Sequence, residues 1–458
     1  MAMICLLAIG KMEVSHGNKL NFKLGQTMKK IFILMASAAV MFAASCNKME
    51  EVNTPVEPVV ETELITIDLN PVTKTSLDGK ATVWTEGDKV SVTVGGKNIG
   101  SLKLVKGTTS TFSGEVEAGK TGAATLNYPA GETSVPTTQA AVAGSFANGA
   151  ALLEGTTTMD ALRAGEGAQL SNTTALLQFS VAQAGDVTFE VGTTKYTVTG
   201  CQTGNTYYAC VAPSANVSFT ARIGGYLSKK ASKNVTFAAN KISNLDELPA
   251  PEASGWCLKG SFDNWKEGFS LFNDLNGNIV AKNIKLSGAF KIVNPSDKYV
   301  RSISNAPTTS KWLTLYDASG DMSLTGTYDV YVNTENKAIC VVTVSSSVPE
   351  FNLSNRELYV SVQSGWGWPY LYGWEGTNTE LWGGWQTRKY DTSLTISNTG
   401  YYCWMVPANF NNKTVSLIAS KSGEQAPTKS GVTLTQDRFY ELKYTNKVEF
   451  NEVTAPTF

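Results

Sequence analysis

Short runs of alternating apolar and polar residues, separated by turn-forming residues, recur along this chain. VSVTV at residues 90–94 precedes two glycines, and VTFEV at 187–191 and TYYACV at 206–211 show similar patterns. A period of two places alternate side chains on one face of a β-strand, and Gly, Asn and Asp form the turns between strands. Within residues 63–248, only 154–163 could hold a short helix. The pattern predicts an all-β protein of tandem β-sandwiches.

Tryptophan usage divides the chain into regions. At 458 residues the chain exceeds the ~250–300 residues at which single cores stop growing. Nine of the ten Trp residues lie from Trp256 onward, and the change coincides with the linker-like sequence PAPEASG at 249–255. SSSVPE at 345–350 marks a second break. We expect four domains, at residues 63–160, 161–248, 255–345 and 351–458.

The N-terminal region has the order of an export signal. MKK at 28–30 is followed by an apolar stretch at 31–42, small residues at 43–45, and then Cys46. This order resembles a bacterial lipoprotein signal, in which the cysteine is lipidated and becomes the mature N-terminus. Residues 1–45 are then an upstream extension and signal peptide, with Met28 as the expected start. An ordinary signal peptide is the alternative.

Residues 46–62 are rich in Pro, Val and Glu and are expected to form a flexible tether. Within them, NKMEE at 47–51 resembles the acidic tag that sends lipoproteins of Bacteroidota to the cell surface, although it could equally be a solvated charge cluster. The expected location is therefore the outer membrane, with the lipid as the anchor and the domains facing the cell surface.

Composition argues against several kinds of chemistry. A formal net charge of -1 offers no basic field for nucleic acid. The one histidine, His16, precedes the expected start, so no Ser-His or Cys-His pair and no imidazole metal ligand is expected. The remaining cysteines lack the CxxC spacing of zinc sites. We predict no metal, no cofactor and no enzymatic activity; a disulfide between Cys257 and Cys340 stays open. These cysteines are Cys201, Cys210, Cys257, Cys340 and Cys403.

Residues 63–248 resemble a fimbrillin-like protein of Bacteroidota. The resemblance rests on VWTEGDKV at 83–90, together with TKTSL at 73–77, LLQFSV at 176–181 and FAANKI at 237–242. It implies two consecutive transthyretin-like β-sandwiches. Some members of that family polymerise into pili by strand insertion. We favour the alternative that these domains space the rest of the protein from the membrane.

Residues 255–345 contain GSFDNW at 260–265, FKIVN at 290–294 and GTYDVYVN at 326–333. The set resembles the immunoglobulin-like starch-binding domains of SusE/SusF-type surface lipoproteins, and the first element also resembles a motif of glycogen-binding modules. The resemblance offers Trp265, Lys291 and Trp312 as glycan-binding candidates. Trp265 could equally be a core residue.

The most specific chemical signal is aromatic: GWGWPYLYGW at 365–374, followed by LWGGW at 381–385. Five Trp within twenty residues are more than the core of one domain of ~100 residues usually needs. Tyr370, Tyr372 and Trp374 are two apart, so a strand would place all three on one face. Aromatic rings suit the apolar C–H faces of sugars, and exposed Trp normally marks a contact surface. Some of these residues, Trp368 or Trp374 among them, could instead belong to the core.

Residues 351–458 resemble the starch-binding module of carbohydrate-binding family 26. That family has a Trp-Gly start, then Pro-Tyr-x-Tyr-x-Trp, then Trp-Pro-Gly; here Gly383 replaces the last proline. The resemblance implies that Tyr370, Tyr372 and Trp382 stack on glucose rings and that Gln425 bonds to hydroxyls.

Together these features predict a surface lipoprotein that binds starch-type α-glucan or maltooligosaccharides. It would pass them to a partner hydrolase and an outer-membrane transporter, beside other glycan-binding lipoproteins. A fimbrillin-type pilus subunit or adhesin is the alternative function. Xylan and β-glucan stay open as ligands, because residue spacing does not show ring orientation.

Overall fold

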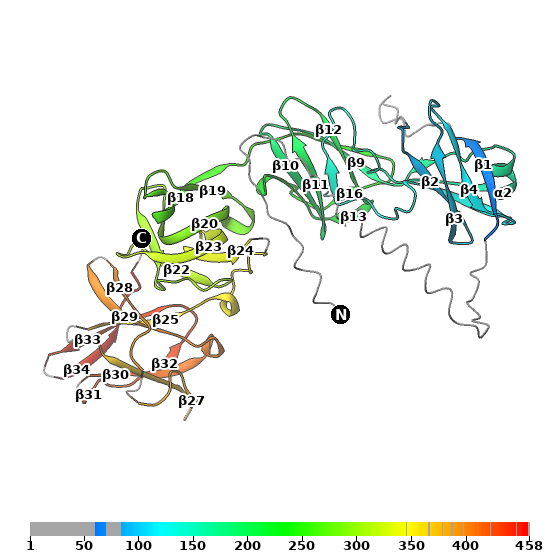
Figure 1. Ribbon diagram of the computed structural model, residues 1–458. Coiled ribbons are helices and arrows are strands. Elements are labelled where there is room, and N and C mark those ends of the chain that lie inside the picture. Colours follow the sequence, from blue (N-terminus) through cyan, green and yellow to red (C-terminus); the bar gives the residue numbers. More distant parts are fainter. Residues whose placement is uncertain are drawn as a thin grey trace, which may run out of the picture. The chain divides into compact units, whose positions relative to one another are not determined.

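The computed structural model describes residues 60–69, 84–344, 346–364, 367–377, 379–385, 388–396, 398–421, 423–445 and 447–456. Its strands form four groups, which follow the chain except that β6 pairs with the second group, and Figure 1 colours the chain from blue to red. The predicted all-β fold of tandem β-sandwiches is confirmed. The predicted signal peptide, Cys46 and the tether up to residue 59 lie outside the described residues, as do residues 73–77. None of the helices in the described ranges is long and apolar enough to cross a membrane.

The first group of strands is built around Trp84. The strand order is β1-β4-β3-β2-β5-β7-β8. The Trp84 ring packs edge-on against Phe112 and Tyr128, each with a centroid distance of 5.0 Å, and its indole N–H donates to the Leu69 carbonyl at 3.1 Å. Trp84 of the WTEGD element therefore has a structural role. The elements are β1 (Thr62–Asp68), β2 (Lys89–Val94), β3 (Lys97–Leu104), β4 (Thr111–Glu117), β5 (Ala123–Tyr128), β7 (Leu153–Thr158), α2 (Met159–Arg163) and β8 (Ser171–Asn172).

The second group packs a five-stranded sheet, in the order β15-β14-β10-β11-β6, and a three-stranded sheet, β12-β9-β17, around one core. β13 and β16 form a separate pair. The chain contributes β6 to this group before it returns to the first group for β7 and β8. The elements are β6 (Thr138–Ala140), β9 (Ala175–Val181), β10 (Gly185–Val191), β11 (Thr194–Cys201), β12 (Tyr207–Val211), β13 (Ser214–Val217), β14 (Phe219–Ile223), β15 (Tyr226–Lys230), β16 (Val235–Phe237) and β17 (Ile242–Leu248).

The third group is one sheet in the order β18-β19-β20-β21-β22-β24-β23. The long strands β20 and β23 also pair with each other, so the sheet closes on itself. Within the described residues Cys257 and Cys340 are free thiols, on β18 and β24. The elements are β18 (Ala253–Gly260), η2 (Ser261–Asp263), β19 (Phe269–Asn273), η3 (Leu275–Gly277), β20 (Asn278–Val293), β21 (Tyr299–Ser302), β22 (Trp312–Tyr316), β23 (Met322–Asn333) and β24 (Ala338–Thr343).

The fourth group is a sandwich of two sheets, β28-β29-β25-β33-β34 and β27-β26-β30-β31, with β32 paired to β30. Trp404 and Tyr440 are fully buried in the core of this group. The elements are η4 (Leu353–Asn355), β25 (Tyr359–Ser364), β26 (Tyr370–Glu375), β27 (Thr379–Glu380), β28 (Thr392–Ile396), β29 (Thr399–Met405), η5 (Ala408–Phe410), β30 (Thr414–Lys421), β31 (Glu424–Gln425), β32 (Lys429–Thr433), β33 (Arg438–Tyr444) and β34 (Val448–Glu452).

The third and fourth groups share a buried contact. Tyr359 and Phe439 of the fourth group belong to the same apolar cluster as the core of the third. The buried Asp437 carboxylate accepts a hydrogen bond from the Tyr316 hydroxyl at 2.6 Å and from the Tyr359 backbone N–H at 2.8 Å. Burial raises the pKa of Asp437 above its ordinary value. The Tyr316–Asp437 hydrogen bond therefore links the third group to the fourth beside their shared apolar cluster.

Candidate functional site

The outer face of β26 carries a row of aromatic side chains. Leu371 and Gly373 are buried on the core side, whereas Tyr370, Tyr372 and Trp374 are half-buried on the opposite side. This is the alternation expected of a half-buried strand. Gly373 leaves room for the core beneath the row, because a Cβ there would lie 2.9 Å from Leu417 Cδ2 and 3.1 Å from the Trp382 ring. β26 thus contributes alternate side chains to the core and to the aromatic row.

Polar side chains from neighbouring strands extend this outer face. Across the β26–β30 pairing, Tyr370 lies opposite Ser420, and Ser420 in turn lies opposite Gln425 of β31. Directly paired residues share a face of the sheet, so Gln425 lies on the same side as the aromatic row. The Gln425 side chain is exposed. A hydroxyl-bearing ligand on the row would find an amide donor and acceptor there.

Two further Trp residues complete the surface. The Trp368 ring contacts Tyr370 at a centroid distance of 5.1 Å with an interplanar angle of 74°, and Trp385 contacts Tyr372 at 5.4 Å and 73°. The Tyr372 and Trp374 rings lie 5.3 Å apart at 31°. Trp368 is 38% exposed and Trp385 37% exposed. We call these five side chains the aromatic face: Trp368, Tyr370, Tyr372, Trp374 and Trp385.

Charged and hydroxyl groups border the aromatic face. The Tyr372 hydroxyl donates to Glu380 Oε1 at 2.9 Å, and this hydrogen bond raises the pKa of Tyr372. The Lys389 amine lies 4.9 Å from the centroid of the Trp368 ring, a cation–π contact. Lys421 Nζ lies beside Gly367, where a Cβ would be 3.0 Å from it. The surface therefore pairs apolar ring faces with hydrogen-bonding groups.

The structure corrects one predicted stacking residue in this domain. Trp382 is only 6% exposed and belongs to the core. Its indole N–H donates to the Met405 carbonyl at 2.7 Å. Trp382 fills the space left by Gly373, so its ring faces inward and is not available to stack on a ligand. Trp385 occupies the outer face instead.

A second, smaller aromatic cluster lies in the third group. Trp265 and Lys291, both predicted from the sequence, meet around Tyr299. The Trp265 and Tyr299 ring centroids are 6.4 Å apart, and the Lys291 amine lies 5.9 Å from the Tyr299 centroid. Tyr299 is 38% exposed and Trp265 is half-buried. Sequence reasoning missed Tyr299, which lies on β21, whereas Lys291 lies on β20 and Trp265 in the turn after η2.

Trp312, the third candidate of that domain, is a core residue. Its side chain is fully buried, and its indole N–H donates to the Pro349 carbonyl at 2.9 Å. The Trp312 ring also packs edge-on against Phe351 at 5.5 Å. The expectation that Trp312 binds glycan is therefore corrected: it fixes the segment that joins the third and fourth groups.

Comparison with known proteins shows only weak structural similarity. No protein-family model matches the chain, and no curated protein matches it. A solved structure of a candidate cell adhesion protein from Bacteroides thetaiotaomicron is similar over 40% of this chain and 92% of that one, with 12% identity and a TM-score of 0.24. A fimbrial protein from Bacteroides ovatus is similar over 47% of this chain and 65% of that one, with 9% identity and a TM-score of 0.22. At these TM-scores neither likeness carries an argument about this chain.

Proposed function

We propose that this chain is a cell-surface adhesive protein that holds α-glucan on the aromatic face of its C-terminal domain. The observation that carries the proposal is the gathering of five aromatic side chains on one outer sheet face, two of them Trp residues more than a third exposed. Contiguous exposed apolar surface of this kind marks a contact site. The hydrogen-bonding groups at its border favour a polyhydroxylated ligand over an apolar protein surface.

Ring orientation favours a helical glycan. The interplanar angles of 74°, 31° and 73° mean that the rings do not form one plane. A flat β-linked chain would lie along coplanar rings, whereas α-1,4-linked glucose units turn relative to one another. A curved chain can place successive sugar faces on tilted rings. α-Glucan is therefore the favoured ligand, with Tyr370, Tyr372 and Trp374 as stacking residues and Gln425 as a hydroxyl partner.

The names of the two solved structures, a cell adhesion protein and a fimbrial protein, describe those proteins; for this chain a pilus-subunit or adhesin function is the alternative to starch capture. An adhesin that binds a glycan would combine adhesion with α-glucan capture. Under this proposal the N-terminal sandwiches space the binding domains from the membrane. A hydrolase and an outer-membrane transporter would be the partners that receive the glycan, and the protein itself performs no catalytic step.

Migration through a native gel tests the proposal. We expect residues 47–458 to be retarded in a gel that contains amylopectin, relative to a plain gel, and to migrate normally in gels that contain xylan or β-glucan. Binding to an immobile polysaccharide slows the protein in proportion to its affinity. Unchanged migration with amylopectin would contradict glucan binding and leave the pilus-subunit function, whose contacts are with protein.

Anchoring is tested at Cys46. Because a lipidated cysteine would hold the protein at the membrane, we expect Cys46→Ala to move the chain from the membrane fraction to the soluble fraction. Cys257→Ala is the matched control and should stay with the membranes. Fractionation followed by detection of the protein measures both. If Cys46→Ala partitions like the parent, the lipoprotein assignment is wrong.

A further inference from the structure

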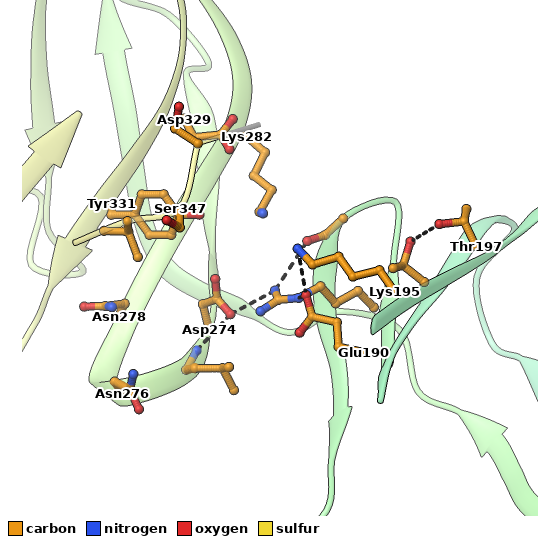
Figure 2. Close-up of a pocket in the computed structure, with 16 residues that line it drawn as sticks. Glu190, Lys195, Thr197, Asp274, Asn276, Asn278, Lys282, Asp329, Tyr331 and Ser347 are labelled. Atoms are coloured by element: carbon orange, nitrogen blue, oxygen red, sulfur yellow. Dashed lines mark hydrogen bonds and ion pairs between the residues drawn. The ribbon is translucent and has the colours of Figure 1, made fainter. Parts of the chain in front are cut away.

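A polar cavity lies where the second group of strands meets the third. Its volume is 610 Å³, within the range of about 300–1,000 Å³ typical of small-molecule sites, which often lie between domains. Figure 2 shows Glu190, Lys195 and Thr197 on one wall, and Asn276, Asn278, Lys282, Asp329, Tyr331 and Ser347 on the other. Most of the lining residues carry polar or charged side chains, which suit a hydrated or polyhydroxylated ligand.

Each carboxylate of the lining already has a partner. Glu190 lies 3.4 Å from the Lys195 amine and 3.3 Å from Arg222 Nε. Asp274 accepts from Arg222 Nη1 at 2.9 Å across the cavity. Asp329 accepts from the Asn283 backbone N–H at 2.7 Å. The Arg222–Asp274 ion pair joins the two walls, whereas the other contacts lie within one wall.

Lys282 differs from the other two cations of the lining, Lys195 and Arg222, which both form ion pairs. Its side chain extends from β20 into the space between the walls (Figure 2). Among the described residues no carboxylate makes an ion pair with its amine, although Asp274, Asp329 and Glu190 act on it at longer range. Burial, and then the positive charge of Arg222, lower the pKa of Lys282. A partly buried cation beside another cation is stabilised by an anion placed between them.

We propose that this cavity binds the carboxylate of a small acidic sugar, a hexuronate, with Lys282 as its ionic partner. The carboxylate would lie in the space that Lys282 and Arg222 face. The sugar hydroxyls would then lie within reach of the amide of Asn276 and the hydroxyl of Ser347, which line the same cavity. The site is separate from the aromatic face and does not depend on glucan binding there.

Titration calorimetry of residues 47–458 with sodium glucuronate tests this site. Glucuronate should bind, and Lys282→Met should weaken its binding by about tenfold or more, as expected when a partly buried charge pair loses one member. Lys285→Met is the matched control: it makes the same change on the same strand, at an exposed position outside the cavity. Its affinity should equal that of the parent.

Three ligands separate the outcomes. Glucose, which has the hydroxyls without the carboxylate, should bind much more weakly than glucuronate. Sodium sulfate should also bind more weakly, because it offers charge without hydroxyls. The proposal is overturned if the parent does not bind glucuronate, if Lys282→Met binds it like the parent, or if glucose binds equally well. Equal binding of sulfate would show an adventitious ion only and would also overturn it. Thermal unfolding of each variant shows that the fold is retained.

Discussion

We expect Trp382→Ala to lower the free energy of unfolding of the C-terminal domain by about 3–5 kcal/mol, the usual cost of removing a large aromatic side chain from a core. Trp382 is almost fully buried, packs beneath Gly373 and donates its indole N–H to the Met405 carbonyl. Alanine would leave a cavity under β26 and an acceptor without its partner. Glycan binding should fall only as far as the domain unfolds.

Trp385→Ala is the matched control for this change. Trp385 follows Trp382 by three residues but is 37% exposed, on the outer face. Its loss should change the free energy of unfolding by about 1 kcal/mol or less. Urea unfolding of the two variants measures the difference. Equal stability losses would contradict the assignment of Trp382 to the core and of Trp385 to the surface.

The second large effect concerns binding. Tyr372→Ala should weaken α-glucan binding by roughly thirtyfold, or about 2 kcal/mol, as at other aromatic hot spots, while the domain stays folded. Tyr372 is central in the aromatic face: its ring contacts both Trp374 and Trp385, and its hydroxyl binds Glu380. Its removal takes away a stacking ring and frees two neighbouring rings to reorient.

Tyr444→Ala is the control for Tyr372→Ala. Tyr444 is 51% exposed, but it lies on β33 in the other sheet of the same domain. Truncating it should leave glucan affinity unchanged. An equal loss in both variants would mean that the effect is not local to the aromatic face. A loss of folding in Tyr372→Ala, detected by urea unfolding, would place that side chain in the core.

The period of two predicted the all-β fold and the aromatic row, because both depend only on neighbours along one strand. The roles of Trp312 and Trp382 do not follow from it. In β22 the side chains of Trp312 and Leu313 are both buried, so buried and exposed residues do not alternate along this strand. Trp382 lies beyond β27, outside any regular strand, where alternation says nothing about direction.

Contacts between segments that are distant along the chain also could not be predicted from the sequence. Tyr299 of β21 contacts Lys291 of β20 and Trp265 of the turn after η2, and residue spacing predicts neither contact. SSSVPE at 345–350 has the composition of a linker, yet the Pro349 carbonyl accepts a hydrogen bond from the Trp312 indole N–H. The buried contact of Asp437 with Tyr316 spans 121 positions in the chain. Such pairs form because burial requires partners, not because local pattern specifies them.

The most direct test of glucan binding is calorimetric titration of residues 47–458 with maltoheptaose, done in parallel on the parent and on Tyr372→Ala. We predict measurable binding by the parent, and binding about thirtyfold weaker by the variant at an unchanged unfolding midpoint. If the parent shows no binding, or if both proteins bind equally well, the aromatic face is not a glucan site.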